Sequence, residues 1–321
     1  MSSLKEIKQH IVAVRQTQKL TKAMNMVAAA KLRSTQSKAE SYEEYADELV
    51  RLLAEIGKRT PILAETLYKP AKDSDRVLLV VLTSDRGLCG SFNFNVIHKT
   101  NKAILDIRKR GLKPCLIVIG RKGLDYYNRE KMAQLLPVKF KVKGNPDGQL
   151  LKPGFPFEHA RKLSDCLIGC FMTGYKEIYV VYTSFLTLNK HPVEILPLLP
   201  LASINPEPKT DEKTELQPAP LDADKPQDES EVSAHLDFTI EPDPEELLKF
   251  LIPNSLATGL YRASLDSVTA ENAARMQAMD NATKSCSDII QSLTMAFNKA
   301  RQASVTNELL DIVNGAEALK G

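Results

Sequence analysis

The chain has 321 residues, a formal net charge of +3 and 26% charged residues. This length allows two domains or one domain with an extended element, and so balanced a charge points to neither a nucleic acid nor a membrane partner. The apolar runs are too short to span a bilayer, and we expect no leader segment and a cytosolic protein. The five cysteines, without CxxC spacing, indicate reduced thiols.

A very long helix is predicted over residues 1–58, roughly 80 Å at 1.5 Å per residue. Ser3 and Glu6 form a capping box, and the pattern stops at Gly57. Its first half is basic, which indicates a solvated face or a face that meets an acidic protein. Nucleic-acid binding is disfavoured because no aromatic stacking residues lie among the lysines. The apolar stripe consists of Ile7, Ile11, Val14, Leu20, Met24, Val27, Ala28, Leu32, Tyr42, Tyr45, Leu49, Leu52, Leu53 and Ile56.

An α/β domain is expected over residues 75–203, because apolar runs of strand length alternate with helical patterns. This alternation favours a sheet covered by helices, Rossmann-like in architecture. The predicted strands are 76–83, 114–120, 135–141 (weak), 177–184 and 192–199, and the predicted helices are 93–110, 121–130 and 157–173.

Residues 204–232 differ in kind from the rest of the chain. Residues 205–232 hold five prolines and nine acids against three lysines, which predicts a disordered surface insertion. His235–Ile240 alternates like an edge strand, so residues 233–249 are expected to return to the α/β domain. Asp243-Pro244-Glu245-Glu246 is typical of a helix start.

A second very long helix is predicted over residues 250–321, roughly 100 Å long. Proline is absent from Asn254 to Lys320, and charged residues throughout exclude a membrane span. A helix of this length needs a partner, so we expect an antiparallel coiled coil with the N-terminal helix and the α/β domain inserted between the two. The apolar stripe consists of Leu265, Val268, Met276, Met279, Ala282, Cys286, Ile289, Leu293, Ala296, Ala300, Ala303, Leu309, Ile312, Val313 and Ala316.

Two stretches invite a ligand-binding interpretation. Ser84–Ser91 lies between a strand and a helix, but Gly87 and Gly90 give only GxxG and no lysine follows, so a tight turn that contacts a protein is favoured over a nucleotide site. Cys166 and Cys170 share a helical face with His159. That histidine lies about 16 Å from Cys170 along a helix, so buried thiols are favoured over a metal site. We therefore predict no cofactor, no metal, no small-molecule substrate and no catalytic residue.

Three regions together resemble the gamma subunit of the F-type (rotary) ATP synthase in its bacterial form. They are Thr17–Leu32, Ser84–Asn93 and the C-terminal segments Ala274–Thr283, Asn298–Ala303 and Thr306–Ala316. The resemblance covers nearly the whole chain in order, apart from residues 205–232. Chloroplast relatives carry two cysteines in an insertion near this point. This insertion has none, so a thiol switch of that type is not supported.

The resemblance implies a fold and a function. The terminal helices would form a shaft inside a ring of alpha and beta subunits, and the α/β domain would form a foot that binds epsilon and the membrane rotor (c) ring. Ion flow would turn the shaft and change the nucleotide affinity of each beta subunit in turn. The chain would be a non-catalytic, peripheral subunit on the cytoplasmic face of the bacterial plasma membrane.

The resemblance also implies contact residues. Arg301, Gln302, Lys19, Lys22 and Met24 match positions that contact beta subunits; the less favoured alternative for Arg301 is a solvent-screened charge. Contacts with epsilon or the ring are implied for Asp85, Arg86, Leu88, Cys89, Phe92 and Asn93. The alternative is a free-standing α/β nucleotide-binding regulator with coiled-coil arms, whose ligand would bind at Ser84–Ser91.

Overall fold

The computed structural model describes residues 4–59, 74–129, 153–200 and 244–318. It divides into two compact units. The coiled-coil unit comprises residues 1–31 and 272–321, and the sheet unit comprises residues 32–271. The predicted cap at Ser3, the weak strand at 135–141, the insertion and the edge strand at 235–240 lie outside the described residues.

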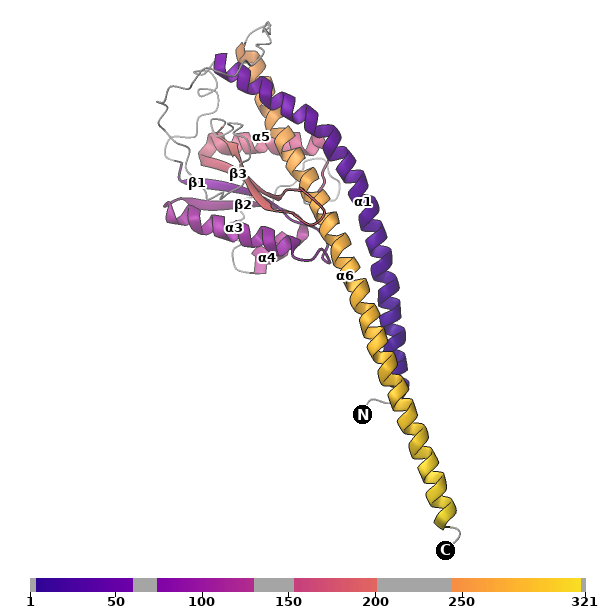
Figure 1. Ribbon diagram of the computed structural model, residues 1–321. Helices are drawn as coiled ribbons and strands as arrows, with labels where there is room; N and C mark the ends of the chain where they lie inside the picture. The colour runs from indigo at the N-terminus through magenta and orange to yellow at the C-terminus, as the bar shows by residue number, and fades with distance from the viewer. Residues whose placement is uncertain (1–3, 60–73, 130–152, 201–243, 319–321) are drawn as a thin grey trace, which may run out of the picture. The chain divides into compact units, whose positions relative to one another are not determined.

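Two long helices dominate the chain, as predicted. Helix α1 spans Leu4–Arg59 and helix α6 spans Pro244–Ala318, 56 and 75 residues respectively (Figure 1). Helix α6 begins at a proline, which costs nothing at the first helical position because that N–H would have no partner in the helix. The helix continues through Pro253. Within the ranges that the structure describes, no helix combines the length and hydropathy that a bilayer crossing requires.

In the coiled-coil unit α1 and α6 pair antiparallel. Gln18 lies against Ser287 and Thr21 against Thr283, so residue numbers rise on one helix as they fall on the other. On each helix, one series of buried and half-buried positions recurs in alternating steps of four and three residues, the spacing of a coiled coil. They are Ile7, Ile11, Val14, Gln18, Thr21, Asn25 and Ala28 on α1, and Asn272, Met276, Met279, Thr283, Cys286, Ile290, Leu293, Phe297, Ala300 and Ser304 on α6.

The predicted apolar stripes are wrong at several positions, because the buried seam follows a seven-residue repeat and not every apolar residue at helical spacing lies on it. Leu20 and Val27 were assigned to the buried side of α1, yet their side chains are 61% and 56% exposed. The seam instead contains the polar residues Gln18, Thr21 and Asn25, so it is not continuously apolar. The other stripe residues that the structure exposes are Tyr45, Ile289, Ala296, Ala303, Leu309, Ile312 and Val313.

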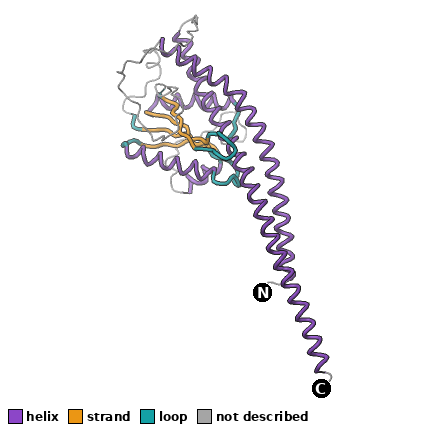
Figure 2. The backbone as a smooth tube through the Cα atoms, in the orientation of Figure 1, coloured by secondary structure: helices purple, strands orange, loops and turns teal. Residues whose placement is uncertain are grey.

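The sheet unit contains a four-stranded sheet of order β2-β1-β3-β4. Strand β1 (Arg76–Leu82) pairs parallel with β2 (Lys113–Ile119) and β3 (Tyr175–Thr183), and β4 (Val193–Leu199) is antiparallel to β3. The Rossmann-like expectation is confirmed, and Figure 2 shows the strands as one orange layer. The predicted helices are α3 (Phe92–Lys109), α4 (Arg121–Arg129) and α5 (Phe157–Gly174).

Successive side chains of β1 enter two different cores, because neighbours on a strand point to opposite faces. Val77, Leu79 and Val81 pack with residues of α3 and α4. Leu78 and Val80 face the other way and pack with residues of α5, α1 and α6. The sheet is therefore covered on both faces.

Within the sheet unit, aromatic contacts join α1 to α6 and α5, and an ion-pair fork joins α6 to α1. The Tyr42 ring of α1 lies 4.8 Å from Tyr261 of α6 and 6.2 Å from Phe157 of α5, centroid to centroid. The Arg262 guanidinium donates to Asp47 at 2.7 Å and to Glu43 at 2.6 Å. Helices α1 and α6 are thus fixed to each other here.

A largely buried ion pair joins α3 to the sheet. Arg110 pairs with Glu177, whose side chain is 14% exposed, and the Tyr179 hydroxyl donates to the same carboxylate at 3.0 Å. We expect Glu177→Gln to lower the free energy of unfolding by about 1–3 kcal/mol in urea denaturation, because the guanidinium stays behind without its counter-charge. Asp106→Asn removes an exposed pair with Lys109 and should cost less than about 0.5 kcal/mol. Equal losses would contradict the prediction.

Candidate partner-contact sites

The loop that follows β1 lies at the carboxyl edge of the parallel strands, where α/β sheets commonly bind their ligands. Figure 2 shows it in teal beyond the ends of the strands. Four of the six residues predicted to contact epsilon or the ring lie in this loop: Asp85, Arg86, Leu88 and Cys89. The other two, Phe92 and Asn93, begin α3 directly after it. The structure divides these six residues into two groups.

The first group holds the loop together. The Ser84 backbone N–H donates to Asn93 Oδ1 at 3.0 Å, and Asn93 Nδ2 donates to Ser84 Oγ at 2.7 Å and to Cys89 Sγ at 3.2 Å. Cys89 and Phe92 are only 1% and 4% exposed. These side chains shape the loop from inside, so any contact they make with a partner is indirect.

Asp85 belongs to the same group through a different contact. Its carboxylate accepts a hydrogen bond from the Arg121 backbone N–H at 3.0 Å, at the start of α4. Thr83 Oγ1 accepts from the Gly123 N–H at 3.0 Å. The Lys122 N–H donates to the Ser84 carbonyl as well, so three N–H groups of the first turn of α4 are occupied, and a phosphate there would meet a carboxylate. Sequence analysis missed this role because the partners are 36 residues apart.

Arg86 and Leu88 form the second group, which faces solvent. Leu88 has φ +63° and its side chain is 62% exposed. A leucine in the left-handed region costs roughly 1–2 kcal/mol, which glycine or asparagine would largely avoid. The loop therefore holds an exposed apolar side chain in a strained backbone conformation, a combination that favours a contact surface.

The residues predicted to contact beta subunits lie in the coiled-coil unit. Lys19, Lys22, Arg301 and Gln302 are exposed, and Met24 is half-buried. Because Thr21 lies opposite Thr283, Arg301 is some 18 residues further along α6, about 27 Å away. The two sets therefore form separate surfaces rather than one compact site.

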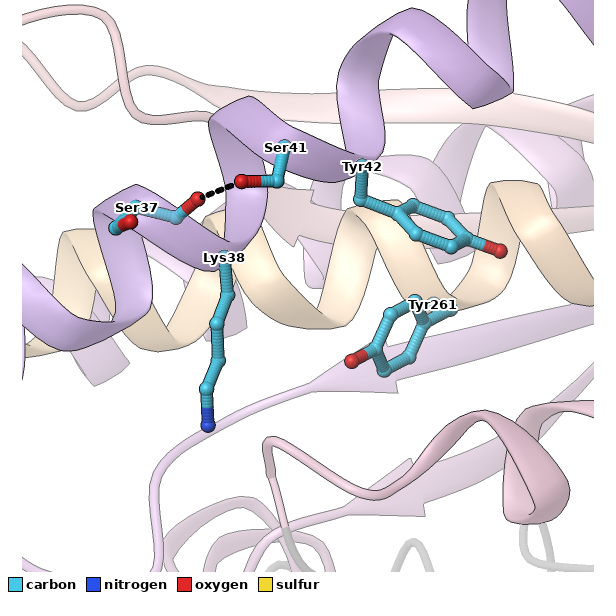
Figure 3. Close-up of a pocket in the computed structure, with 5 residues that line it drawn as sticks. All are labelled: Ser37, Lys38, Ser41, Tyr42 and Tyr261. Atoms are coloured by element: carbon cyan, nitrogen blue, oxygen red, sulfur yellow. Dashed lines mark hydrogen bonds between the residues drawn. The ribbon is translucent and has the colours of Figure 1, made fainter.

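A shallow pocket of about 370 Å³ lies between α1 and α6 in the sheet unit (Figure 3). Ser41 Oγ donates to the Ser37 carbonyl at 2.8 Å, and the Tyr42 hydroxyl donates to Thr258 Oγ1 at 3.2 Å. Figure 3 shows the Tyr261 hydroxyl on the same side as Lys38. An ammonium and hydroxyl groups can hold an oxygen anion, but they supply no nucleophile with an adjacent base. These five lining residues therefore do not form a catalytic arrangement.

The two cysteines of α5 are less buried than expected. Cys166 and Cys170 are half-buried, and a hydrogen bond from the Cys170 thiol lowers the pKa of Cys166. His159 is also half-buried. Within the described ranges, no group of three histidine, cysteine or acidic side chains is arranged to hold a metal ion.

The family model and the related sequences match this chain over nearly its full length, and they indicate the same family. A family model described as ATP synthase matches residues 3–319. The chain is 37% identical over 322 residues to the ATP synthase gamma chain of Syntrophobacter fumaroxidans and 38% identical over 324 residues to that of Desulfotalea psychrophila. Each alignment covers 100% of both chains.

Solved structures show a similar fold. A chain of the Tetrahymena thermophila mitochondrial ATP synthase, in its central stalk and c-ring, matches with a TM-score of 0.56 and 23% identity, over 82% of this chain and 99% of that one. A chain of the Euglena gracilis mitochondrial ATP synthase matches with a TM-score of 0.59 and 16% identity, over 98% and 94%.

Proposed function

Because the chain belongs to the ATP synthase gamma chain family, we propose that it is the central rotor shaft of an F-type ATP synthase. Ion flow through the membrane ring turns the chain inside the catalytic head. Its asymmetric surface changes the conformation of the beta subunits in sequence, and this couples rotation to ATP synthesis or hydrolysis. The chain itself carries no catalytic residue and needs no cofactor.

The observation that carries this proposal is the antiparallel pair of helices, 56 and 75 residues long, with a seven-residue repeat in its seam. A shaft must transmit torque along its length, which requires long helices that are packed together. The far end of α6 adds support. Residues 305–315 are all exposed and include Val305, Leu309 and Ile312, more apolar surface than a helix leaves in water without a partner.

The division of the chain follows from this role. We assign residues 1–58 and 250–321 to the shaft, residues 75–203 and 233–249 to the foot, and residues 204–232 to an insertion. The shaft meets alpha and beta subunits, and the foot meets epsilon and the c ring. The protein then lies at the cytoplasmic face of the bacterial plasma membrane as a peripheral part of the complex.

Each surface is assigned a set of contact residues. Arg301, Gln302, Lys19 and Lys22 are exposed and meet the beta subunits, with Met24 at the edge of that surface. On the foot, Arg86 and Leu88 make the direct contacts. Asp85, Cys89, Phe92 and Asn93 act by holding the loop in place.

Reconstitution tests the proposal. The chain is added to matching alpha and beta subunits, and ATP hydrolysis is measured with and without it. We expect a stable complex whose multisite turnover depends on the chain. A chain that does not associate, yet binds a nucleotide by itself at Ser84–Ser91, would instead be the free-standing regulator. Nucleotide binding is measured on the same preparation by equilibrium dialysis.

The Arg301→Ala variant tests whether Arg301 contacts a beta subunit, through the affinity of the chain for the complex of alpha and beta subunits. An arginine paired with a carboxylate at an interface is worth about 1–3 kcal/mol, so we expect the chain to bind the head roughly tenfold more weakly. Lys5→Ala, which removes another exposed cation of the same unit, is the control. If both variants bind equally well, Arg301 is a solvent-screened charge.

The Leu88→Asn variant is expected to change the stability of the chain and its binding to partners in opposite directions. Asparagine tolerates the left-handed region, so the variant should be up to about 1 kcal/mol more stable than the parent chain in urea denaturation. The same variant should bind epsilon or the c ring more weakly, because the exposed leucine is gone. A variant that gains stability and keeps full binding would remove Leu88 from the contact surface.

A further inference from the structure

We propose that a polar cluster in the coiled-coil seam sets the register of α1 against α6. The cluster consists of Gln18, Thr21 and Asn25 of α1 with Met276, Thr283 and Ser287 of α6. The functional part of this inference rests on the proposed role of the chain as a rotor shaft. The structural part, the register itself, can be tested without it.

Three hydrogen bonds cross the seam within this cluster. Gln18 Nε2 donates to Ser287 Oγ at 2.7 Å, and Asn25 Nδ2 donates to the Met276 carbonyl at 2.9 Å. Between them, the hydroxyls of Thr21 and Thr283 lie 2.8 Å apart, and either can donate. Thr21 is 9% exposed, and buried Ala28 and Met279 complete the neighbouring layers. The threonine pair is thus the largely buried middle contact of the cluster, with the Gln18 and Asn25 contacts on either side of it.

Each threonine hydroxyl also lies within hydrogen-bond distance of a carbonyl of its own helix. Thr21 Oγ1 is 3.0 Å from the Gln18 carbonyl oxygen, and Thr283 Oγ1 is 2.7 Å from that of Met279. A hydroxyl has one hydrogen, so the threonine that donates across the seam gives up the bond within its helix. The other threonine keeps its bond to its own helix and accepts from the first, so this arrangement requires the two threonines at the same level.

The apolar part of the seam cannot define the register by itself. A coiled coil repeats every seven residues, so moving α6 by seven residues, about 10.5 Å, returns seam positions to seam positions. The threonine pair distinguishes these alignments. After such a shift Thr21 would face Ile290 in one direction or Met276 in the other, and neither side chain offers a comparable hydrogen bond. Single polar layers fix register in this way in other coiled coils.

Register matters for a shaft because torsion tends to slide paired helices past each other. A pair that slides absorbs rotation instead of transmitting it. In the sheet unit the fork of Arg262 on Glu43 and Asp47 opposes sliding. The polar cluster performs the same task within the coiled-coil unit.

The test replaces both threonines with valine, which has the same shape and fits the seam. Thr21→Val/Thr283→Val removes the polar layer without opening a cavity. The matched control is Thr17→Val/Thr294→Val. These two threonines are exposed on the same helices, and each hydroxyl bonds only its own backbone in the contacts described, to Ala13 and Ile290.

Cysteine cross-linking reads the register in the full chain assembled with alpha and beta subunits. Val14→Cys/Ile290→Cys reports the observed alignment, because both positions lie seven residues from the threonine layer. Val14→Cys/Phe297→Cys reports a shift by one repeat. Native cysteines are replaced by alanine in both pairs. Ile11→Cys with the native Cys286 reports the opposite shift.

We expect only the observed alignment in the parent chain and in the control. In the valine variant the shifted products should rise at least tenfold relative to the parent chain. If the variant gives the observed alignment alone, the polar cluster does not set the register and the inference is overturned. If the valine variant shifts register but ATP hydrolysis by the complex never depends on the chain, the polar cluster does set the register and the chain is not the shaft.

Discussion

Replacing Gly120 by alanine is expected to lower the free energy of unfolding by about 3–5 kcal/mol. Gly120 ends β2 with φ +101°, a conformation that side-chain-bearing residues rarely adopt. A β-carbon there would overlap the carbonyl oxygen of Thr83 and come within 2.7 Å of Thr83 Oγ1. The strained backbone and the collision with main-chain atoms both oppose the substitution, and no flexible side chain can move aside.

Gly111→Ala is the matched control for this effect. Gly111 also has a positive φ, +74°, but a β-carbon there meets no atom within 4 Å. It should therefore cost only the backbone penalty, about 1–2 kcal/mol. Urea denaturation of both variants, followed by circular dichroism, measures the difference. Equal losses would show that the approach of Gly120 to Thr83 is not the cause.

The second large effect is expected at alkaline pH. Burial is the main cause that raises the pKa of Tyr175 and of Tyr179 to about 12, from an ordinary value of 10.0. The unfolded chain therefore loses these protons at a lower pH than the folded chain. Between pH 10 and 12 the folded state binds more protons, so stability falls as pH rises. Tyr175 by itself should account for a loss of roughly 2–3 kcal/mol by pH 12.

Stability measured in urea at intervals from pH 8 to pH 12 tests this prediction. Tyr175→Phe should flatten the alkaline fall, because phenylalanine fills the same space without an ionisable group. Tyr45→Phe changes a tyrosine that is 52% exposed and serves as the control. An identical pH profile for Tyr175→Phe and the parent chain would exclude Tyr175 as a source of the alkaline loss.

Local patterns predicted the elements of this protein well. The runs around Val77–Leu82 and Pro114–Ile119 are apolar and β-branched, and they form two of the strands expected, which the structure pairs parallel. The helix predicted over 93–110 spans Phe92–Lys109, and Gly111 follows shortly after its end. Such signals depend on neighbouring residues only, so they can be recognised before the fold is known.

Contacts between distant residues were the part that local patterns missed. Asp85–Asn93 was expected to present one contact surface. In the structure, however, Asp85 accepts a hydrogen bond from the Arg121 N–H, and Asn93 accepts one from the Ser84 N–H. These partners are brought together by the parallel pairing of strands. Only the folded sheet therefore shows that Arg86 and Leu88 are the exposed members.

Two long helices that flank an α/β domain could be predicted from local patterns, because helix formers, breakers and strand residues act over a few positions. Which side of each helix is buried depends on the folded chain. Leu20 and Val27 satisfy helical spacing but lie outside the seam, and Thr21 takes a place in it. The reason is physical. Burial depends on the partner helix, and the hydroxyl of Thr21 is compatible with the seam because Thr283 lies opposite.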